Sequence, residues 1–150
     1  MSEVWDEARI QQYIDDKIEE NLNLDYKAAD ALDKKKTDDI TKAVSAMANS
    51  DGGIIIYGID EGQTNRHYPS KIDPIDRRKF SKEQLEHIIN NIRPKIDGLV
   101  IYPVSIQPDP NKPDSKPVVY VVDIPKGRTA HQATDRKYYR RYNFESVPML

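Results

Sequence analysis

Three carboxylates could meet at one point if the segments that carry them are neighbours in space. Glu20 lies shortly before a short apolar–polar alternation, Asp25 lies within it, and Asp60 follows the apolar run 54–59. Because successive side chains of a strand point to opposite faces, Glu20 can approach Asp25 only from a preceding helix end or turn. Such a trio would be an oxygen-rich site of the kind that Mg²⁺ or Mn²⁺ prefers. In a nuclease, a metal held there would stabilise charge on the scissile phosphate and prepare water for attack.

A structural role would also explain these residues. Lys27 shares the strand face of Asp25, because residues two apart in a strand point the same way. Asp25 could therefore pair with Lys27 or with an arginine, and Asp60 could cap the turn after its strand. At a metal site Lys27 would instead lie at the edge of the groove, where it could meet a phosphate. Both interpretations stay open at this point.

The segment that must position Asp60 is a helix followed by a glycine turn and a strand. Apolar residues in 40–47 recur at three- and four-residue steps, which is the period of one helical face. We expect Gly52 or Gly53 to have the positive φ with which a chain often leaves a helix. The run 54–59 is apolar on both faces, which is typical of a central, buried strand.

The remaining pattern predicts a single α+β domain over residues 1–150, with a mixed β-sheet of about five strands and three helices packed on it. A first helix is expected over 1–22, where isoleucines recur every four residues. Ser81 and Gln84 form a capping box that begins a third helix, which Pro94 ends. Strands are expected at 24–28, 54–59, 99–106, 117–124 and 137–142.

Composition narrows the classes of protein. The absence of cysteine excludes disulfides, thiolate catalysis and Cys-based zinc sites. Since the sequence has neither a membrane-spanning apolar run nor a signal-peptide pattern, a cytoplasmic protein without membrane contact is expected. The net charge of −2 is unevenly distributed: residues 1–62 carry 15 acidic and 7 basic side chains, net −8, and residues 63–150 carry 10 and 16, net +6.

Positive charge is concentrated near the C-terminus. Between Lys126 and Arg141, six Lys or Arg stand against one Asp, with two tyrosines among them. Such a segment can bind phosphates while its tyrosines stack on bases, although an ordinary solvated surface would have a similar composition. Because a strand alternates, Tyr138 and Arg140 face one way, and Tyr139 and Arg141 face the other. The candidate nucleic-acid contacts are Lys27, Lys126, Arg128, Arg136, Tyr138, Arg140 and Arg141.

The spacing of these motifs resembles the Schlafen-type AlbA-like DNA-binding domain family, Schlafen AlbA_2. That family reads Glu, four residues, Glu-Phe-Lys, then a helix, Ala-Phe-Ala-Asn-x-x-Gly-Gly, an aliphatic strand, Gly-Val-Asp-Asp and, later, Tyr-Tyr-Val-Arg. The corresponding residues here are Glu20, Asp25-Tyr26-Lys27, 46–53, Gly58-Ile59-Asp60-Glu61 and Tyr138-Tyr139-Arg140-Arg141. The resemblance spans roughly residues 20–148.

The resemblance implies a nucleic-acid-binding module. In ribonuclease members of the family the active site is a trio of two Glu and one Asp, which Glu20 and Asp60 match in type while Asp25 replaces a Glu. The family's retained arginine corresponds to Arg141, which is therefore the first choice among the phosphate contacts. A buried salt bridge is the alternative role for that arginine.

We therefore expect a nucleic-acid-binding domain, a DNA-binding or transcriptional-regulator module, that contacts the phosphates of DNA or RNA through its basic C-terminal segment. The first alternative is a Mg²⁺- or Mn²⁺-dependent endoribonuclease that uses Glu20, Asp25 and Asp60. The second is a protein-interaction or oligomerisation module, which leaves a homo-oligomer open. We thus favour a binding module over an enzyme, and we assign no cofactor other than the Mg²⁺ or Mn²⁺ of the first alternative. The domain could also be one piece of a longer regulator.

Overall fold

A mixed five-stranded sheet forms the centre of the computed structural model, which describes residues 4–64 and 66–149. In this sheet β1 (Leu24–Lys27) runs parallel to β2 (Gly53–Tyr57), and β2 runs antiparallel to β7 (Pro117–Ile124). β7 also pairs antiparallel with β5 (Ile75–Asp76) and β6 (Val100–Ser105). Together with three α-helices in the described ranges, this sheet confirms the predicted α+β fold.

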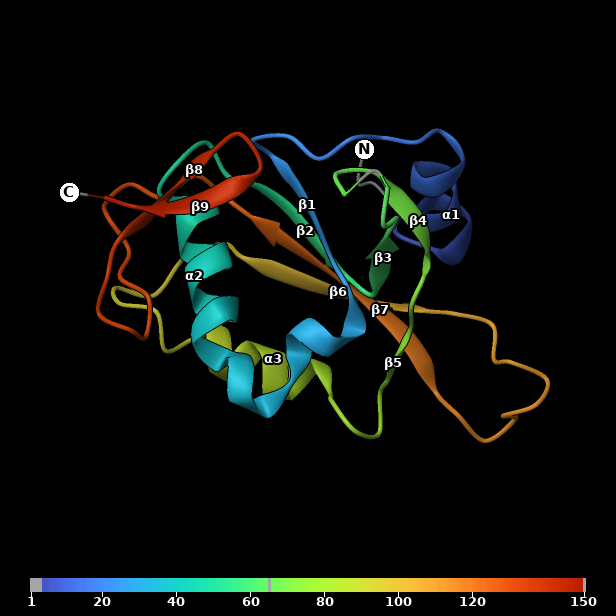
Figure 1. The fold of residues 1–150 in the computed structure, drawn as a ribbon. Helices are drawn as coiled ribbons and strands as arrows, with labels where there is room; N and C mark the ends of the chain where they lie inside the picture. Colours follow the sequence, from blue (N-terminus) through green and yellow to red (C-terminus); the bar gives the residue numbers. More distant parts are fainter. Residues whose placement is uncertain (1–3, 65, 150) are drawn as a thin grey trace.

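Both faces of the sheet are covered (Figure 1). One face, with Ile55 and Val122, packs against α2 and α3, and the opposite face, with Ile56 and Val121, packs against α1 and a small hairpin. Because both faces are buried, the strands β2, β6 and β7 are apolar in nearly every position. The elements outside the sheet are α1 (Glu7–Asp15), α2 (Thr37–Ala48), α3 (Lys82–Ile89), the hairpin of β3 (Ile59–Glu61) and β4 (Pro69–Ile72), and the hairpin of β8 (Tyr139–Tyr142) and β9 (Glu145–Pro148).

The first helix is shorter than the predicted 1–22, of which residues 1–3 lie outside the described ranges. Asp6 caps its start by accepting from the backbone of Arg9, and the helix ends at Asp15. Acidic side chains follow at this end, where the helix dipole disfavours negative charge. Lys17 has a φ of 51°, so the chain turns away, and Ile18 reaches the core from a turn rather than from the helix.

The central strand ends earlier than predicted. Gly58, at φ 114°, redirects the chain after Tyr57, and Ile59–Glu61 becomes the separate strand β3. Asp60 therefore does not end the buried central strand, and it lies opposite Lys71 in the β3–β4 hairpin. This bend decides which acidic side chain can reach β1.

The turn between α2 and β2 confirms the expected glycine conformations, since Gly52 has φ 75° and Gly53 has φ 151°. A Cβ at Gly53 would lie 2.7 Å from the carbonyl carbon of Asn23, so glycine also permits the close approach of β2 to the start of β1. Next to these glycines, Asn49 accepts from the backbone N–H of His131 and donates to the carbonyls of His131 and Tyr139. The end of α2 thus holds the C-terminal segment in place.

Candidate functional site

Three carboxylates converge at the outer edge of β1, and we call Glu20, Asp25 and Glu61 the carboxylate cluster. One oxygen from each of the three lies within 4.8 Å of the others. They come from the turn before β1, from β1 itself and from the end of β3. The structure thus brings together Glu20 and Asp25 as expected, but Glu61 and not Asp60 completes the group. Because of the bend at Gly58, the sequence prediction was one residue out of register.

Glu20 is fixed by the free edge of β1. Its Oε2 accepts the backbone N–H of Tyr26 at 2.9 Å, and its Oε1 lies 3.1 Å from Nδ1 of His67. Its own backbone N–H donates to the carbonyl of His67 at 2.8 Å. The side chain is therefore held in one orientation, and Glu20 is only 4% exposed.

Asp25 is the most deeply placed member of the cluster, at 2% exposure. Lys27 Nζ lies 3.3 Å and Arg141 Nη1 3.7 Å from its Oδ2, yet that oxygen has no hydrogen-bond partner among the described residues. Burial raises the pKa of Asp25 from 3.8 to about 7, the hydrogen bond with Glu20 raises it further, and the charge of Lys27 opposes the rise. The buried Tyr57 hydroxyl, whose pKa is raised by burial and by the charge of Asp25, is likewise unpaired in the described chain.

Glu61 opens the cluster to solvent. It is half-buried, and burial raises its pKa, whereas the hydrogen bond with Glu20 lowers it and the charge of Asp25 raises it. Lys27, whose side chain is 39% exposed, stands at the same opening. Two of the three carboxylates therefore lie inside the protein, and the third can be reached from outside.

This donor set fits a hard divalent cation. Carboxylate oxygens are the ligands that Mg²⁺ and Mn²⁺ favour, and the unpaired Oδ2 of buried Asp25 is an acceptor without a donor. Burial above all, and the adjacent Glu20 after it, raise the pKa of Asp25, and a bound cation would oppose both by favouring the ionised carboxylate. Lys27 and Arg141 already supply positive charge to Asp25, so a cation would share that carboxylate with them.

The C-terminal arginine belongs to this cluster rather than to the surface. Arg141 is only 5% exposed, and its guanidinium donates to the carbonyls of Asn21, Asn143 and Phe144. Its backbone N–H donates to Oγ of Ser50, and this hydrogen bond attaches β8 to the turn after α2. Arg141 therefore occupies the position of the alternative, a buried salt bridge, and not the surface position expected of a first phosphate contact.

The other basic candidates remain on the surface. Tyr138 and Arg140 are exposed, whereas their alternating neighbours Tyr139 and Arg141 are buried, so the strand alternation was predicted correctly. Lys126 is exposed, 3.9 Å from Asp51. Arg128 and Arg136 are exposed as well, and Arg136 has a φ of 68°. Lys27, also predicted as a contact, lies at the carboxylate cluster.

Comparison with known proteins settles the family. The family model described as Schlafen, AlbA_2 matches residues 20–150. The chain belongs to this family. It is thus a nucleic-acid-related domain, as its sequence motifs implied.

The Schlafen AlbA_2 domain also has a structural counterpart. The crystal structure of the DIP2311 protein from Corynebacterium diphtheriae is similar with a TM-score of 0.55 and 16% sequence identity, over 95% of this chain. The chain spans 26% of that protein's length, and at this identity the likeness shows the fold alone. No curated protein matches the sequence. None of the helices in the described ranges has the length and apolarity needed to cross a membrane.

Sequence reasoning missed two residues beside the carboxylate cluster of this Schlafen AlbA_2 domain. His67, which holds Glu20, stacks on Phe144 at the tip of the β8–β9 hairpin, with 3.8 Å between ring centroids and 14° between planes. The histidine lies in an irregular loop and the phenylalanine near the end of the chain, so neither has a periodic pattern around it. The acidic cluster is therefore closed on one side by the C-terminal hairpin.

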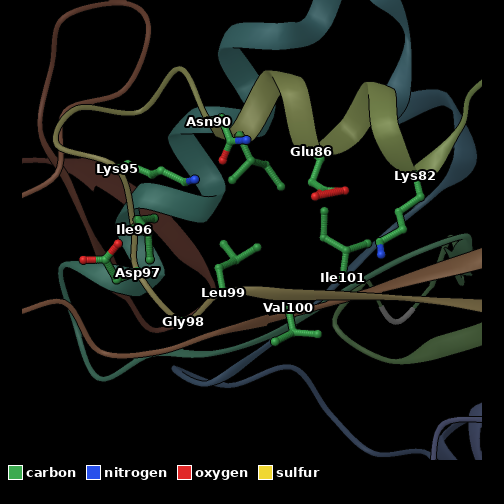
Figure 2. A pocket seen from close by; sticks show the side chains of 11 residues that line it. Lys82, Glu86, Asn90, Lys95, Ile96, Asp97, Gly98, Leu99, Val100 and Ile101 are labelled. Atoms are coloured by element: carbon green, nitrogen blue, oxygen red, sulfur yellow. The ribbon is translucent and has the colours of Figure 1, made fainter.

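One pocket of the Schlafen AlbA_2 domain lies apart from the carboxylate cluster. It has about 290 Å³ and lies between α3 and the start of β6 (Figure 2). Leu99 and Ile101 point toward the helix and form its floor, whereas Val100 points away. Lys82 and Lys95 stand at its two ends. None of the predicted site residues lines this pocket.

Proposed function

We propose that this domain binds nucleic acid and cleaves its phosphodiester backbone with the help of a divalent cation at Glu20, Asp25 and Glu61. The observation that carries the proposal is the convergence of the three carboxylates within 4.8 Å around a buried, unpaired oxygen of Asp25. Buried acidic groups of this kind cost stability, so their convergence favours a functional role.

The residues of the cluster have distinct tasks in this proposal. Bound Mg²⁺ or Mn²⁺ would stabilise negative charge on the phosphate and lower the pKa of a water. Glu20 is held in a fixed orientation by Tyr26 and His67, which reduces reorganisation when it becomes a ligand. Asp25 gives up its proton readily near neutral pH, since its pKa is about 7. Lys27, partly exposed at the opening, can meet a substrate phosphate.

Binding without cleavage is the competing function, and one observation favours it. Lys27 and Arg141 both lie within 4 Å of Asp25, so this carboxylate already has positive neighbours without a metal. Substrate would then be held by Lys27 and the exposed basic residues alone. A role in transcription, assembly into a homo-oligomer and a cytoplasmic location stay predictions from the sequence.

A cleavage assay separates the two functions. Labelled tRNA, single-stranded DNA and duplex DNA are each incubated with the protein in Mn²⁺ and in EDTA. We expect products that depend on Mn²⁺ from at least one substrate, and the substrate that is cut also decides between RNA and DNA. Retardation in a gel without cleavage would instead support the binding module.

Two adjacent substitutions make the assay specific for the cluster. Glu61→Gln removes one carboxylate of the cluster, whereas Asp60→Asn changes the neighbouring half-buried carboxylate, which lies opposite Lys71. We expect Glu61→Gln to abolish cleavage and Asp60→Asn to keep it within a few-fold of the wild-type rate. The reverse result would restore the trio predicted from the sequence and contradict the site proposed here.

A further inference from the structure

A pocket adjoins the solvent-facing side of the carboxylate cluster. It has about 560 Å³ and is lined by Glu61, Gly62, Gln63 and Arg66 from the β3–β4 hairpin. Its size lies in the range of small-ligand sites, which suits a single nucleotide rather than a duplex. Since Glu61 belongs to both the pocket and the cluster, a nucleotide in the pocket would lie next to the cluster.

The positive charges around the cluster differ in what they are free to bind. Arg141 is buried and donates to three backbone carbonyls, so it cannot reach a substrate. Lys27 lies 3.3 Å from Asp25. Arg66 is exposed, and within the described part of the chain it makes neither a hydrogen bond nor an ion pair, although Glu61 lines the same pocket.

Arg78 provides a comparison, because its guanidinium is already paired with a carboxylate. Arg78 donates to both carboxylate oxygens of Asp76, at 3.1 and 2.9 Å. Arg66 has no such partner in the described ranges, so its donors are available to a ligand. A guanidinium binds phosphate through two parallel hydrogen bonds, and this match is specific to arginine.

We propose that Arg66 binds a backbone phosphate of a single-stranded nucleic acid whose nucleotide occupies the pocket beside Glu61. The inference rests on the proposed function and names the substrate class and a binding residue for it. Arg66 and Glu61 line one pocket, so the guanidinium attracts the strand that the acidic cluster alone would repel. The β3–β4 hairpin thereby joins substrate binding to the cluster.

The test compares Arg66→Ala and Arg66→Lys with Arg78→Ala, an exposed arginine outside this pocket. The probe is a fluorescent single-stranded RNA of twelve nucleotides, with single-stranded DNA of the same sequence beside it. In Mn²⁺ we expect Arg66→Ala to raise KM about tenfold with kcat within about twofold, since a charge-assisted hydrogen bond to the substrate is removed. Arg66→Lys should fall between, and Arg78→Ala should match the wild type.

Binding in EDTA tests the inference without cleavage. There we expect Arg66→Ala to weaken binding and to reduce the slope of log affinity against log salt by about 0.7, as for one phosphate contact on a single strand. If wild-type protein cleaves nothing but shows this difference, the proposed cleavage fails and the role of Arg66 stands. The inference is overturned if Arg66→Ala behaves like Arg78→Ala, if it lowers kcat with KM unchanged, or if neither strand binds to the wild type.

Discussion

The carboxylate cluster and the basic segment, residues 126–141, show how differently one chain can treat its charged groups. In the cluster, two of three acidic side chains are nearly inaccessible, and backbone groups and fixed side chains hold them. In the basic segment most charged side chains are exposed, as Lys126 and Arg140 are. Arg141 is the exception, because its side chain is buried and its guanidinium lies 3.7 Å from the carboxylate of Asp25. Burial, rather than local net charge, decides which charges are structural.

The two regions meet at the glycine turn after α2. A Cβ at Gly52 would lie 2.6 Å from the carbonyl oxygen of Ile124, just before the basic segment. A Cβ at Gly53 would lie 2.7 Å from the backbone of Asn23, just before Asp25. The turn therefore keeps both regions in their places, and a side chain at either glycine should displace both of them.

Gly53→Val should have the largest effect. The substitution combines a left-handed φ with a clash against backbone that cannot move, so we expect the free energy of unfolding to fall by more than about 3 kcal/mol. Urea unfolding followed by circular dichroism measures the change. Gly98→Ala is the control, since Gly98 also has positive φ but only a 3.7 Å contact with Pro125, and it should cost less. Equal losses in both variants would show that φ alone, and not the close approach of β1, requires glycine here.

Arg141→Ala should have the next largest effect. It leaves Asp25 buried without one of its positive neighbours and removes the guanidinium hydrogen bond that ties the C-terminal hairpin to Asn21, so we expect a loss of about 3–5 kcal/mol. Arg140→Ala, one residue away and exposed, should change stability by no more than about 0.5 kcal/mol. Urea unfolding of both variants above pH 7, where Asp25 is ionised, measures the difference. If the two variants were equally stable, the buried salt bridge of Arg141 would contribute nothing to stability, and a phosphate contact would be the better account of this residue.

The pH dependence of stability should sharpen the contrast through Asp25. Its pKa is raised from 3.8 to about 7 in the folded protein, so the folded state holds a proton that the unfolded state releases. The resulting contribution is fully present below about pH 4 and is lost as pH rises to about 7, by up to about 4 kcal/mol. In EDTA, the stability of wild type relative to Asp25→Asn should therefore fall across this window.

Adding Mn²⁺ should make that fall smaller, because a bound cation favours the ionised carboxylate. Unfolding curves at several pH values, with Mn²⁺ and with EDTA, test both parts. A relative stability that rises between pH 4 and 7 would mean that Asp25 is stabilised as a carboxylate by Lys27 and Arg141.

The regular elements could be predicted from the sequence because their patterns are local. Strand β7 was predicted with its observed limits, and the capping box of Ser81 and Gln84 begins α3 as expected. The short strands β3 and β5, of three and two residues, are too brief for any periodicity to appear. The end of α1 depends on charges near Asp15 that the isoleucine pattern does not include.

The site could be predicted only in part, for a related reason. Glu20 and Asp25 are five residues apart and belong to one strand and the turn before it, so their proximity is local, and the structure places the two side chains together. The choice of Glu61 over Asp60 depends on the bend at Gly58, which shifts the register by one residue. Alternation predicted that one pair in β8 would be buried, but Ser50 and Asn49, some 90 residues away, decide which.

The smallest expected effect concerns the exposed part of the basic segment. Arg128→Ala combined with Arg140→Ala should leave stability nearly unchanged, since both side chains are exposed. If this segment touches phosphates of duplex DNA, affinity should fall a few-fold, and the slope of log affinity against log salt should become shallower by about 0.9 for each phosphate that is no longer bound. Fluorescence anisotropy at several salt concentrations gives both quantities, and the double variant Lys112→Ala/Lys116→Ala, in the proline-rich loop, serves as a charge-matched control. An equal slope change in that control would mean that any two positive charges act at long range, and the basic segment would then be an ordinary solvated surface.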